Sequence, residues 1–303
     1  MGLGEQLIAP GPPAGEPAGA VEVRSTLRLA LRAFRRDRFA VAGAVFMGIV
    51  IVAAVAAPII SPYSPLVGSN HLDAPMFSPG HLLGTDDQGR DILSRIIWGG
   101  RSTLPTAVIP VIVASAVSLL LGSLAGFYQG WLGNLIMRVL DVFFAVPMVL
   151  LGVAIAGILG AGPLNVMISM TVVMVPFITR VIYTDAALMR RSEFVQAAVV
   201  CGSSPFKILL EQVVPNVLPG LIVYATTNMG AMVVFAAGFS FLGLGVQPPT
   251  PDWGLMAADG RSSLMVAPQI AAIPGVVIIL VAVAFNFVGD GLRDALDPRR
   301  RTA

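Results

Sequence analysis

The stretch DAALMRRSEFVQAAVVCGSSPFKILLEQVVPNVLP, residues 185–219, interleaves polar and apolar side chains, whereas the sequence around it is almost continuously apolar. Its apolar side chains recur at helical spacing in two runs, Phe194, Ala197, Ala198 and Cys201 and then Phe206, Leu209, Leu210 and Val213. Gly202 lies between the two runs. It is expected to end the first helix, because glycine adopts the left-handed conformation without steric cost. Ser204 and Pro205 are typical of an N-cap and a first helical residue, and Pro215 has no N–H to continue the second helix. The stretch therefore predicts two short helices that are joined at a glycine hinge.

The apolar stripe on these two helices permits two interpretations. It suits a surface that docks on another protein or on the membrane face. It also suits ordinary packing on neighbouring parts of the same chain, which the spacing alone favours. Cys201 lies on the stripe, so we expect it to be a small packed core residue. The polar side chains that flank the stripe are Arg190, Arg191, Glu193, Gln196, Lys207 and Glu211.

Three features of this stretch resemble the "EAA" loop in the permease subunits of bacterial ABC importers. They are the run Gln196-Ala197-Ala198, Gly202 after three further residues, and the later run Val213-Val214-Pro215. In that family the loop forms coupling helices that sit in a groove of a separate ATPase subunit, so the resemblance favours docking. The chain departs from the family pattern at Gln196, where a glutamate is usual, and the change removes a charge. The coupling residues that the resemblance implies are Glu193, the flat contact face of Gln196, Ala197 and Ala198, the turn at Gly202, the plug of Phe206 and Leu210, and Pro215.

The composition of the chain is that of a membrane protein. Of its 303 residues, 56% are hydrophobic and only 12% are charged, and the mean hydropathy is +0.83. A soluble domain carries roughly 25% charged residues, so this chain has too few polar groups to cover a surface in water. The net charge of +2 does not indicate nucleic-acid binding, because the arginines lie at the ends of apolar runs. The single cysteine excludes an internal disulfide and a multi-cysteine metal site.

Six apolar runs are long enough to cross a bilayer, which takes about 20 residues. They are residues 39–60, 104–127, 139–159, 163–183, 217–242 and 270–288. We therefore predict an all-α membrane protein with six transmembrane helices. Residues 1–23 are expected to be a disordered tail, and residues 24–38 an amphipathic helix on the cytoplasmic membrane surface.

The distribution of positive charge predicts the orientation of these spans. With both termini in the cytoplasm, 15 of the 19 lysines and arginines are cytoplasmic, Arg180 among them. Only four lie outside, as the positive-inside rule expects: Arg90, Arg95, Arg101 and Arg261.

A few residues inside the spans interrupt the apolar pattern. Gly122 and Gly126 form a GxxxG pair, which either lets two helices approach closely or is incidental in a glycine-rich chain. Pro147 is expected to bend the third span. Asn228 and Asn286 need hydrogen-bond partners in lipid, so they either hold helices together or line a polar path.

A long polar loop, residues 61–101, separates the first two spans. It contains LGTDDQGRDILSRIIWGGRSTL, residues 83–104, which lacks the glycine spacing and distal glutamate of a calcium-binding EF-hand. We expect Thr85 or Asp86 to cap a short helix that begins near Gln88. The loop is therefore predicted to be structural.

No constellation of residues in the sequence indicates catalysis or a metal site. The two histidines, His71 and His81, do not form an HExxH pair, and we expect both to be exposed in the loop. A P-loop needs GxxxxGK[ST], but the only lysine, Lys207, stands between phenylalanine and isoleucine. If ATP drives this protein, a partner must hydrolyse it.

Three blocks of sequence closely resemble one subfamily of ABC importer permeases, the dipeptide/oligopeptide subfamily. They are LGTDDQGRD (residues 83–91), SFLGLGVQPPTPDWGLMAADGRSSL (240–264) and FNFVGDGLRDALDPR (285–299). Together with the EAA-like loop, the resemblance covers roughly residues 30–301. It identifies the chain as similar to the C-type subunit, with the type I ABC importer permease fold.

That resemblance implies how the chain is divided and what surrounds it. Residues 39–101 hold the first span and the outer loop, 102–291 the importer domain with coupling helices at about 186–215, and 292–303 a cytoplasmic tail. The implied partners are a B-type permease, two ATPase subunits and an extracytoplasmic peptide-binding protein. ATP and Mg²⁺ are then held by the ATPases, and this chain needs no cofactor.

The expected protein is thus half of a translocation pathway for di- and oligopeptides in the bacterial inner membrane. Related permeases carry nickel or glutathione, so these remain alternative cargoes. Two other classes of protein are a stand-alone channel, which predicts flux from this chain alone, and an intramembrane enzyme, which predicts an ionisable pair that the sequence does not show.

Overall fold

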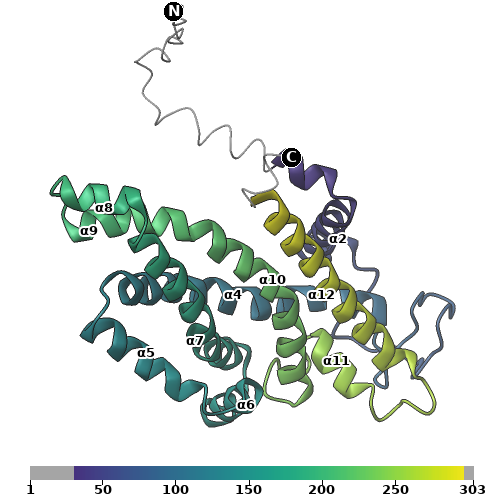
Figure 1. The fold of residues 1–303 in the computed structure, drawn as a ribbon. Helices are drawn as coiled ribbons and strands as arrows, with labels where there is room; N and C mark the ends of the chain where they lie inside the picture. The colour runs from purple at the N-terminus through teal and green to yellow at the C-terminus, as the bar shows by residue number, and fades with distance from the viewer. Residues whose placement is uncertain (1–30, 297–303) are drawn as a thin grey trace, which may run out of the picture.

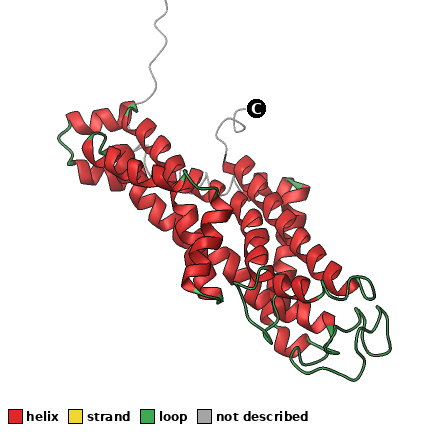
Figure 2. Ribbon diagram, turned by 90° about the horizontal axis from the view of Figure 1, so that it is seen from below, coloured by secondary structure: helices red, strands yellow, loops and turns green. Residues whose placement is uncertain are grey.

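A computed structural model describes residues 31–296, and their regular structure is helical (Figures 1 and 2). The elements are α2 (Arg38–Val55), α3 (Ala57–Ile60), α4 (Ile92–Phe127), α5 (Trp131–Phe143), α6 (Met148–Leu159), α7 (Pro163–Arg190), α8 (Glu193–Val200), α9 (Pro205–Ile208), a π-helical turn (Leu209–Val213), α10 (Val214–Phe241), α11 (Trp253–Asp259) and α12 (Gln269–Leu296). Five helical segments are long and apolar enough to cross a membrane, and the bent pair α5–α6 makes six when it is counted as one span. The predicted all-α fold with six spans is confirmed.

The third predicted span, residues 139–159, is a broken helix. Its first part, α5, already begins at Trp131, and α6 leaves α5 at an angle of 84°. Pro147 directly precedes α6, and proline both lacks an N–H for the preceding turn and restricts the residue before it. The bend expected at Pro147 is confirmed, whereas the single span expected over residues 139–159 was wrong in its extent.

The two glycines of the GxxxG pair bring α4 against α7. A Cβ atom added to Gly122 would lie 2.6 Å from the Cβ of Ile182, and one added to Gly126 would lie 2.6 Å from the carbonyl oxygen of Tyr183. Neither distance is compatible with a side chain, so only glycine permits this approach. The close-packing interpretation of the pair is therefore the correct one.

The first span is capped and packs along the last one. The carboxylate of Asp37 accepts hydrogen bonds from the backbone N–H groups of Phe39 (2.8 Å) and Ala40 (3.2 Å), which satisfies two unpaired donors at the start of α2. The rings of Phe39 and Phe287 lie 5.3 Å apart, so α2 contacts α12 from its first turn. This contact joins the two ends of the described chain.

The predicted terminal segments lie largely outside the described residues. This holds for the tail at 1–23 and for the first part of the surface helix at 24–38, of which residues 31–36 are helical. The first residues of the tail expected at 292–303 are helical, because α12 continues to Leu296.

The outer loop ends in a cap that differs from the expected one. Helix α4 begins at Ile92, and Asp91 caps it by accepting hydrogen bonds from the backbone N–H and the hydroxyl of Ser94, at 2.8 and 2.7 Å. The expectation that Thr85 or Asp86 caps a helix near residue 88 was wrong. Asp86 instead closes a turn within the loop, where its carboxylate accepts two backbone N–H groups.

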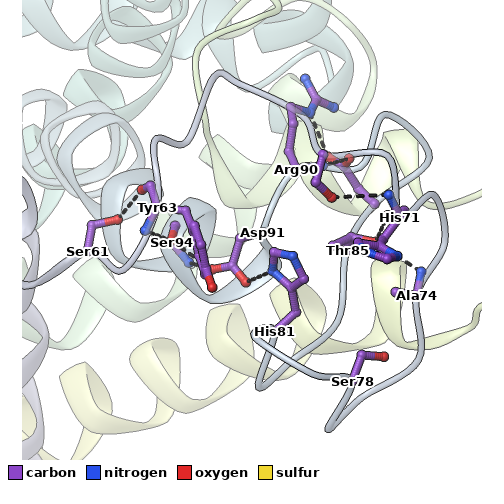
Figure 3. A network of polar contacts seen from close by, with 12 residues as sticks. Ser61, Tyr63, His71, Ala74, Ser78, His81, Thr85, Arg90, Asp91 and Ser94 are labelled. Carbon is purple, nitrogen blue, oxygen red and sulfur yellow. Dashed lines mark hydrogen bonds and ion pairs between the residues drawn. The ribbon is translucent and has the colours of Figure 1, made fainter.

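One of the two histidines is a buried part of this loop rather than an exposed residue. His81 is 7% exposed, and its Nδ1 lies 2.9 Å from the free carboxylate oxygen of Asp91, as Figure 3 shows. Its ring also packs against Tyr63, with the ring centroids 4.8 Å apart. Because the carboxylate of Asp91 is 2% exposed, its second oxygen needs a partner in the protein. His71 is exposed, as expected.

A second contact ties α11 to the start of α4. The indole N–H of Trp253 donates to the carbonyl oxygen of Ile96 at 2.9 Å. The hydroxyl of Thr103 donates to Asp252 at 2.6 Å and accepts from the backbone N–H of Trp253 at 3.1 Å. Because Trp253 is 1% exposed, this contact fixes the outer loops onto the helical body.

The structure has two distinct ends. In Figure 1, α8 and α9 lie on the same side as the C-terminal end of α12, and α11 lies on the opposite side. Figure 2 shows the longest loops gathered at one end of the helical body. The two short helices α8 and α9 are thus remote from the long loops.

Candidate functional site

The first half of the site is helix α8, which follows α7 after a two-residue break. Gln196 on α8 donates from Nε2 to the carbonyl oxygen of Arg191 at 3.2 Å. A glutamate has no proton to donate at this position when it is ionised. The glutamine that departs from the family pattern therefore closes the junction between α7 and α8 from within the chain.

The hinge between α8 and α9 has the geometry of a Schellman motif. Gly202 has a φ of +80°, and its N–H donates to the carbonyl of Val199, while the N–H of Ser203 donates to the carbonyl of Ala198. A Cβ atom at Gly202 would meet no other atom within 4 Å. Glycine is favoured here by the backbone conformation and not by lack of space, which confirms its predicted role as a helix stop.

The second half of the site runs without a stop into the fifth span. Ser204 caps α9 by accepting from the N–H of Lys207 at 3.4 Å, and Pro205 is the first helical residue, both as predicted. The end predicted at Pro215 was wrong. The π-helical turn bonds the N–H of Val214 to the carbonyl of Leu209, and Pro215 then falls in the first turn of α10, where a missing N–H costs nothing.

We call residues 193–213 the coupling segment, and its exposed face differs from the predicted stripe. In α8 the buried residue is Val195, at 1% exposure, while Phe194, Ala197 and Cys201 face outward. The expectation that Cys201 is a packed core residue was wrong. The large apolar side chains that are exposed in the coupling segment are Phe194 (47%), Val199 (58%), Val200 (87%), Phe206 (63%) and Leu210 (49%).

The second predicted run divides between core and surface. Leu209 and Val213 are buried at 3% and 0% exposure, and they attach the segment to the helical body. Phe206 and Leu210, which the resemblance assigns to a plug, project outward. The coupling segment therefore has an anchored side and a free apolar side.

A groove of about 780 Å³ lies beside this free side. Its floor includes Phe127 at the end of α4 and Ile208 of α9, and its rim carries Arg190 and Arg191. Val200 also lines it, so the exposed face of α8 continues into the groove. This shape suits a partner that places apolar and acidic groups against the segment.

The two asparagines inside the spans, Asn228 and Asn286, find their partners in different ways. Asn228 donates from Nδ2 to the carbonyl of Tyr224 on its own helix at 2.7 Å. Asn286 of α12 lies against Gly230 of α10, where an added Cβ would be 2.6 Å from its Oδ1. Asn286 thus contributes to helix packing, whereas Asn228 is satisfied within α10.

Sequence reasoning missed a charged cluster at the outer end of the fold. The guanidinium of Arg90 binds Asp86 at 2.7 Å, and that of Arg95 approaches the same carboxylate at 3.3 Å. Asp259 of α11 reaches both arginines at 4.0 Å. Burial raises the pKa of Asp259, and the charges of Arg95 and Arg90 offset this only in part. The acidic and basic residues of LGTDDQGRD are the only sign of this cluster in the sequence. Their partner Asp259 lies far along the chain, so the sequence alone does not connect them.

The fold and this segment define a class of protein, a multi-pass helical membrane subunit with an exposed apolar face at one end. Residues 118–302 match the family described as "Binding-protein-dependent transport system inner membrane component", and residues 25–80 match the "N-terminal TM domain of oligopeptide transport permease C". The chain belongs to this family, as a C-type permease subunit of the peptide class of ABC importers. It is a multi-pass permease of the inner membrane.

Individual relatives agree with this assignment. The glutathione transport system permease protein GsiD of Escherichia coli strain 536 is 39% identical over 282 residues, which cover 92% of each chain. The protein of the same name from Pectobacterium atrosepticum is 36% identical over 284 residues, covering 92% of this chain and 93% of the relative. Among solved structures, the inward-facing MetNI methionine ABC transporter is similar with a TM-score of 0.54 and 19% identity, over 66% of this chain and 96% of that one. That similarity confirms the type I importer permease fold.

Proposed function

We propose that this subunit forms half of the translocation pathway of a peptide importer and receives its driving force through the coupling segment. The other half is a B-type permease, and two ATPase subunits bind ATP and Mg²⁺. An extracytoplasmic binding protein delivers the cargo at the end that carries the long loops. In this arrangement both termini and the coupling segment are cytoplasmic.

The observation that carries this proposal is the free apolar face of the coupling segment. Val200, at 87% exposure, lines a groove whose rim is basic, and Phe206 on α9 is 63% exposed. Exposed apolar side chains gathered at one helical hairpin outside the spans indicate a protein contact. Because the segment continues through the π-helical turn into α10, a push on its free face is transmitted directly to a membrane span.

The cargo follows from the relatives and from the family together. One match is described as part of an oligopeptide permease, and relatives named as glutathione permeases cover 92% of this chain. Glutathione is itself a small peptide with free carboxylates. Di- and oligopeptides are therefore the proposed cargo class, and glutathione is the first member to test.

The docking proposal is tested by placing a charge on the free face. Val200→Glu and Phe206→Glu are expected to reduce the ATPase that co-purifies with the subunit at least tenfold, because a carboxylate in an apolar contact must be desolvated without a partner. Both side chains are exposed, so membrane insertion should be unchanged. The matched control is Met265→Glu, which alters a residue that is 96% exposed in an outer loop.

The opposite outcome of this experiment would contradict the docking proposal. If the ATPase is retained by Val200→Glu and Phe206→Glu as well as by Met265→Glu, the coupling segment is not the docking face. Hydrolysis of ATP by the purified single chain, or cargo flux through it alone in liposomes, would support an enzyme or a channel instead.

A further inference from the structure

An ion pair between helices α5 and α7 is half exposed. The guanidinium of Arg180 on α7 binds the carboxylate of Asp141 on α5, and the two side chains are 51% and 54% exposed. The guanidinium also lies 4.2 Å from the centre of the Phe144 ring, and that ring packs against Phe177 at 4.7 Å. The pair sits where α5 ends and the chain bends by 84° into α6.

The position of Arg180 along α7 places it within the membrane. At about 1.5 Å per residue, it lies about 25 Å from Pro163 at one end of the helix and about 15 Å from Arg190 at the other. A helix of 28 residues is about 42 Å long and exceeds a hydrocarbon layer of about 30 Å by about 12 Å. Even if all of this excess lay on the Arg190 side, Arg180 would remain inside the hydrocarbon layer. The charge count places Arg180 on the cytoplasmic side, whereas the length of α7 favours a position just inside the hydrocarbon layer.

Charged groups at this depth are costly next to lipid and face a protein contact or a water-filled space. The exposed residues of helix α5 fall into a polar stripe and an apolar stripe. Asn134, Arg138 and Asp141 are exposed at helical spacing, so they form a polar stripe that leads to Arg180. A separate exposed stripe is entirely apolar and contains Leu135 (45%), Val139 (54%) and Val142 (70%). The apolar stripe suits lipid or a partner helix, and the polar stripe suits water.

We propose that the Asp141–Arg180 pair lies on the wall of the translocation pathway and that Arg180 binds the carboxylate of a passing substrate in exchange for Asp141. This inference deepens the proposed function and rests on it, because peptides and glutathione carry free carboxylates. Arg180 is then a residue that determines specificity for anionic cargo.

The chemistry of the pair supports such an exchange. A guanidinium presents a planar set of N–H donors that matches a carboxylate in two parallel hydrogen bonds. The Phe144 ring holds the guanidinium from one face by a cation–π contact, which leaves its edge free for a carboxylate. Asp141 occupies that edge in the absence of substrate, so no unpaired charge remains in the pathway wall.

The first test asks whether the pair faces water in the assembled transporter. Asp141→Cys and Val142→Cys, each with Cys201→Ser in the full complex, place a thiol on adjacent residues of the polar and the apolar stripe. A charged, membrane-impermeant thiol reagent should modify Asp141→Cys at least tenfold faster than Val142→Cys. Equal rates, or a faster reaction at Val142→Cys, would overturn the proposal.

The second test asks whether Arg180 recognises a carboxylate. In proteoliposomes with the complete importer, uptake of a peptide is compared with uptake of the same peptide as its C-terminal amide. Arg180→Gln should slow the carboxylate form at least tenfold and the amide less than twofold, and Arg180→Lys should restore part of the difference. The control is Arg101→Gln, because Arg101 is exposed and stacks on Trp98 at 5.0 Å in a similar way.

The outcomes separate this inference from the function on which it rests. If the unmodified importer carries the peptide but Arg180→Gln slows both forms equally, the function stands and the carboxylate role is overturned. If the unmodified importer carries neither form, the cargo proposal fails, and the role of Arg180 in binding a peptide carboxylate fails with it.

Discussion

Gly202 determines the shape of the coupling segment, because it is the point at which α8 turns back into α9. Its φ of +80° is readily adopted by glycine and tolerated by asparagine, but costs a β-branched residue about 1–2 kcal/mol or more. The open space around it means that a side chain meets no clash there. Within this chain, substitutions at this position therefore act through the backbone conformation and not through a steric clash.

We accordingly expect Gly202→Val to reduce the ATPase that co-purifies with the subunit, and Gly202→Asn to retain most of it. Both variants should insert normally, because Gly202 contacts no span. Quantitative co-purification from membranes measures the difference. Equal retention by the two variants would show that the left-handed turn is not needed for docking.

The buried Asp91–His81 pair is expected to stabilise the outer loop. His81→Ala removes the partner of a carboxylate oxygen that is 2% exposed, which should lower the free energy of unfolding by about 1–3 kcal/mol. His71→Ala is the control, because His71 is exposed and its loss should change stability by less than about 0.5 kcal/mol. Thermal unfolding of the purified complex compares the two, and an equal effect would argue against a stabilising pair.

At the scale of elements, the contact between α4 and α7 depends on the absence of side chains. Gly126→Leu is expected to destabilise the subunit by several kcal/mol or to prevent assembly, because a Cβ at this position already lies 2.6 Å from a backbone oxygen. Gly157→Leu makes the same chemical change in α6, where no other atom lies within 4 Å, and should be tolerated. Yield and thermal stability in detergent provide the measurement, and similar behaviour of the two variants would contradict it.

The charged cluster between α4 and α11 gives a prediction about pH. Burial raises the pKa of Asp259, so the folded state holds this proton more tightly than the unfolded state does. The contribution of Asp259 to stability is then present at low pH and is lost as the pH rises through the folded pKa. Asp259→Asn should therefore gain stability relative to the unmodified protein between pH 4 and pH 7. If it loses stability over that range, the ion pairs with Arg90 and Arg95 outweigh burial.

The elements that sequence could predict are those whose signals are local. Helical spacing, the glycine stop at Gly202 and the cap at Ser204 each depend on a few neighbouring residues, and the structure confirms them. Pro147 and Pro215 show the limit. Both lack an N–H, but Pro147 precedes a new helix axis, whereas a π-helical turn places Pro215 in a first turn where the N–H is not needed. The difference comes from the register of the preceding turn, which the residue itself does not reveal.

Across the whole molecule, sequence could not predict which side of each element is covered. The stripe containing Phe194 has the spacing of a core face, but Val195 is the buried residue of α8. The carboxylate that binds Arg180 belongs to Asp141 on another helix, and that of His81 belongs to Asp91, which the folding of the loop brings to the ring. Burial depends on contacts between distant segments, and in a subunit of a larger complex it also depends on chains that the sequence does not contain.

The orientation of the whole molecule can be tested with the cysteine that the chain already has. Cys201 is exposed in the coupling segment, so it should react with a membrane-impermeant maleimide in inside-out vesicles and remain unmodified in right-side-out ones. Met265→Cys combined with Cys201→Ser moves the thiol to an outer loop and should show the opposite pattern. In the proposed complex the ATPase covers the coupling segment, so its removal should increase the labelling of Cys201 and leave that of Met265→Cys unchanged. Labelling of Cys201 from the outside would reverse the topology and, with it, the route by which ATP hydrolysis reaches the spans.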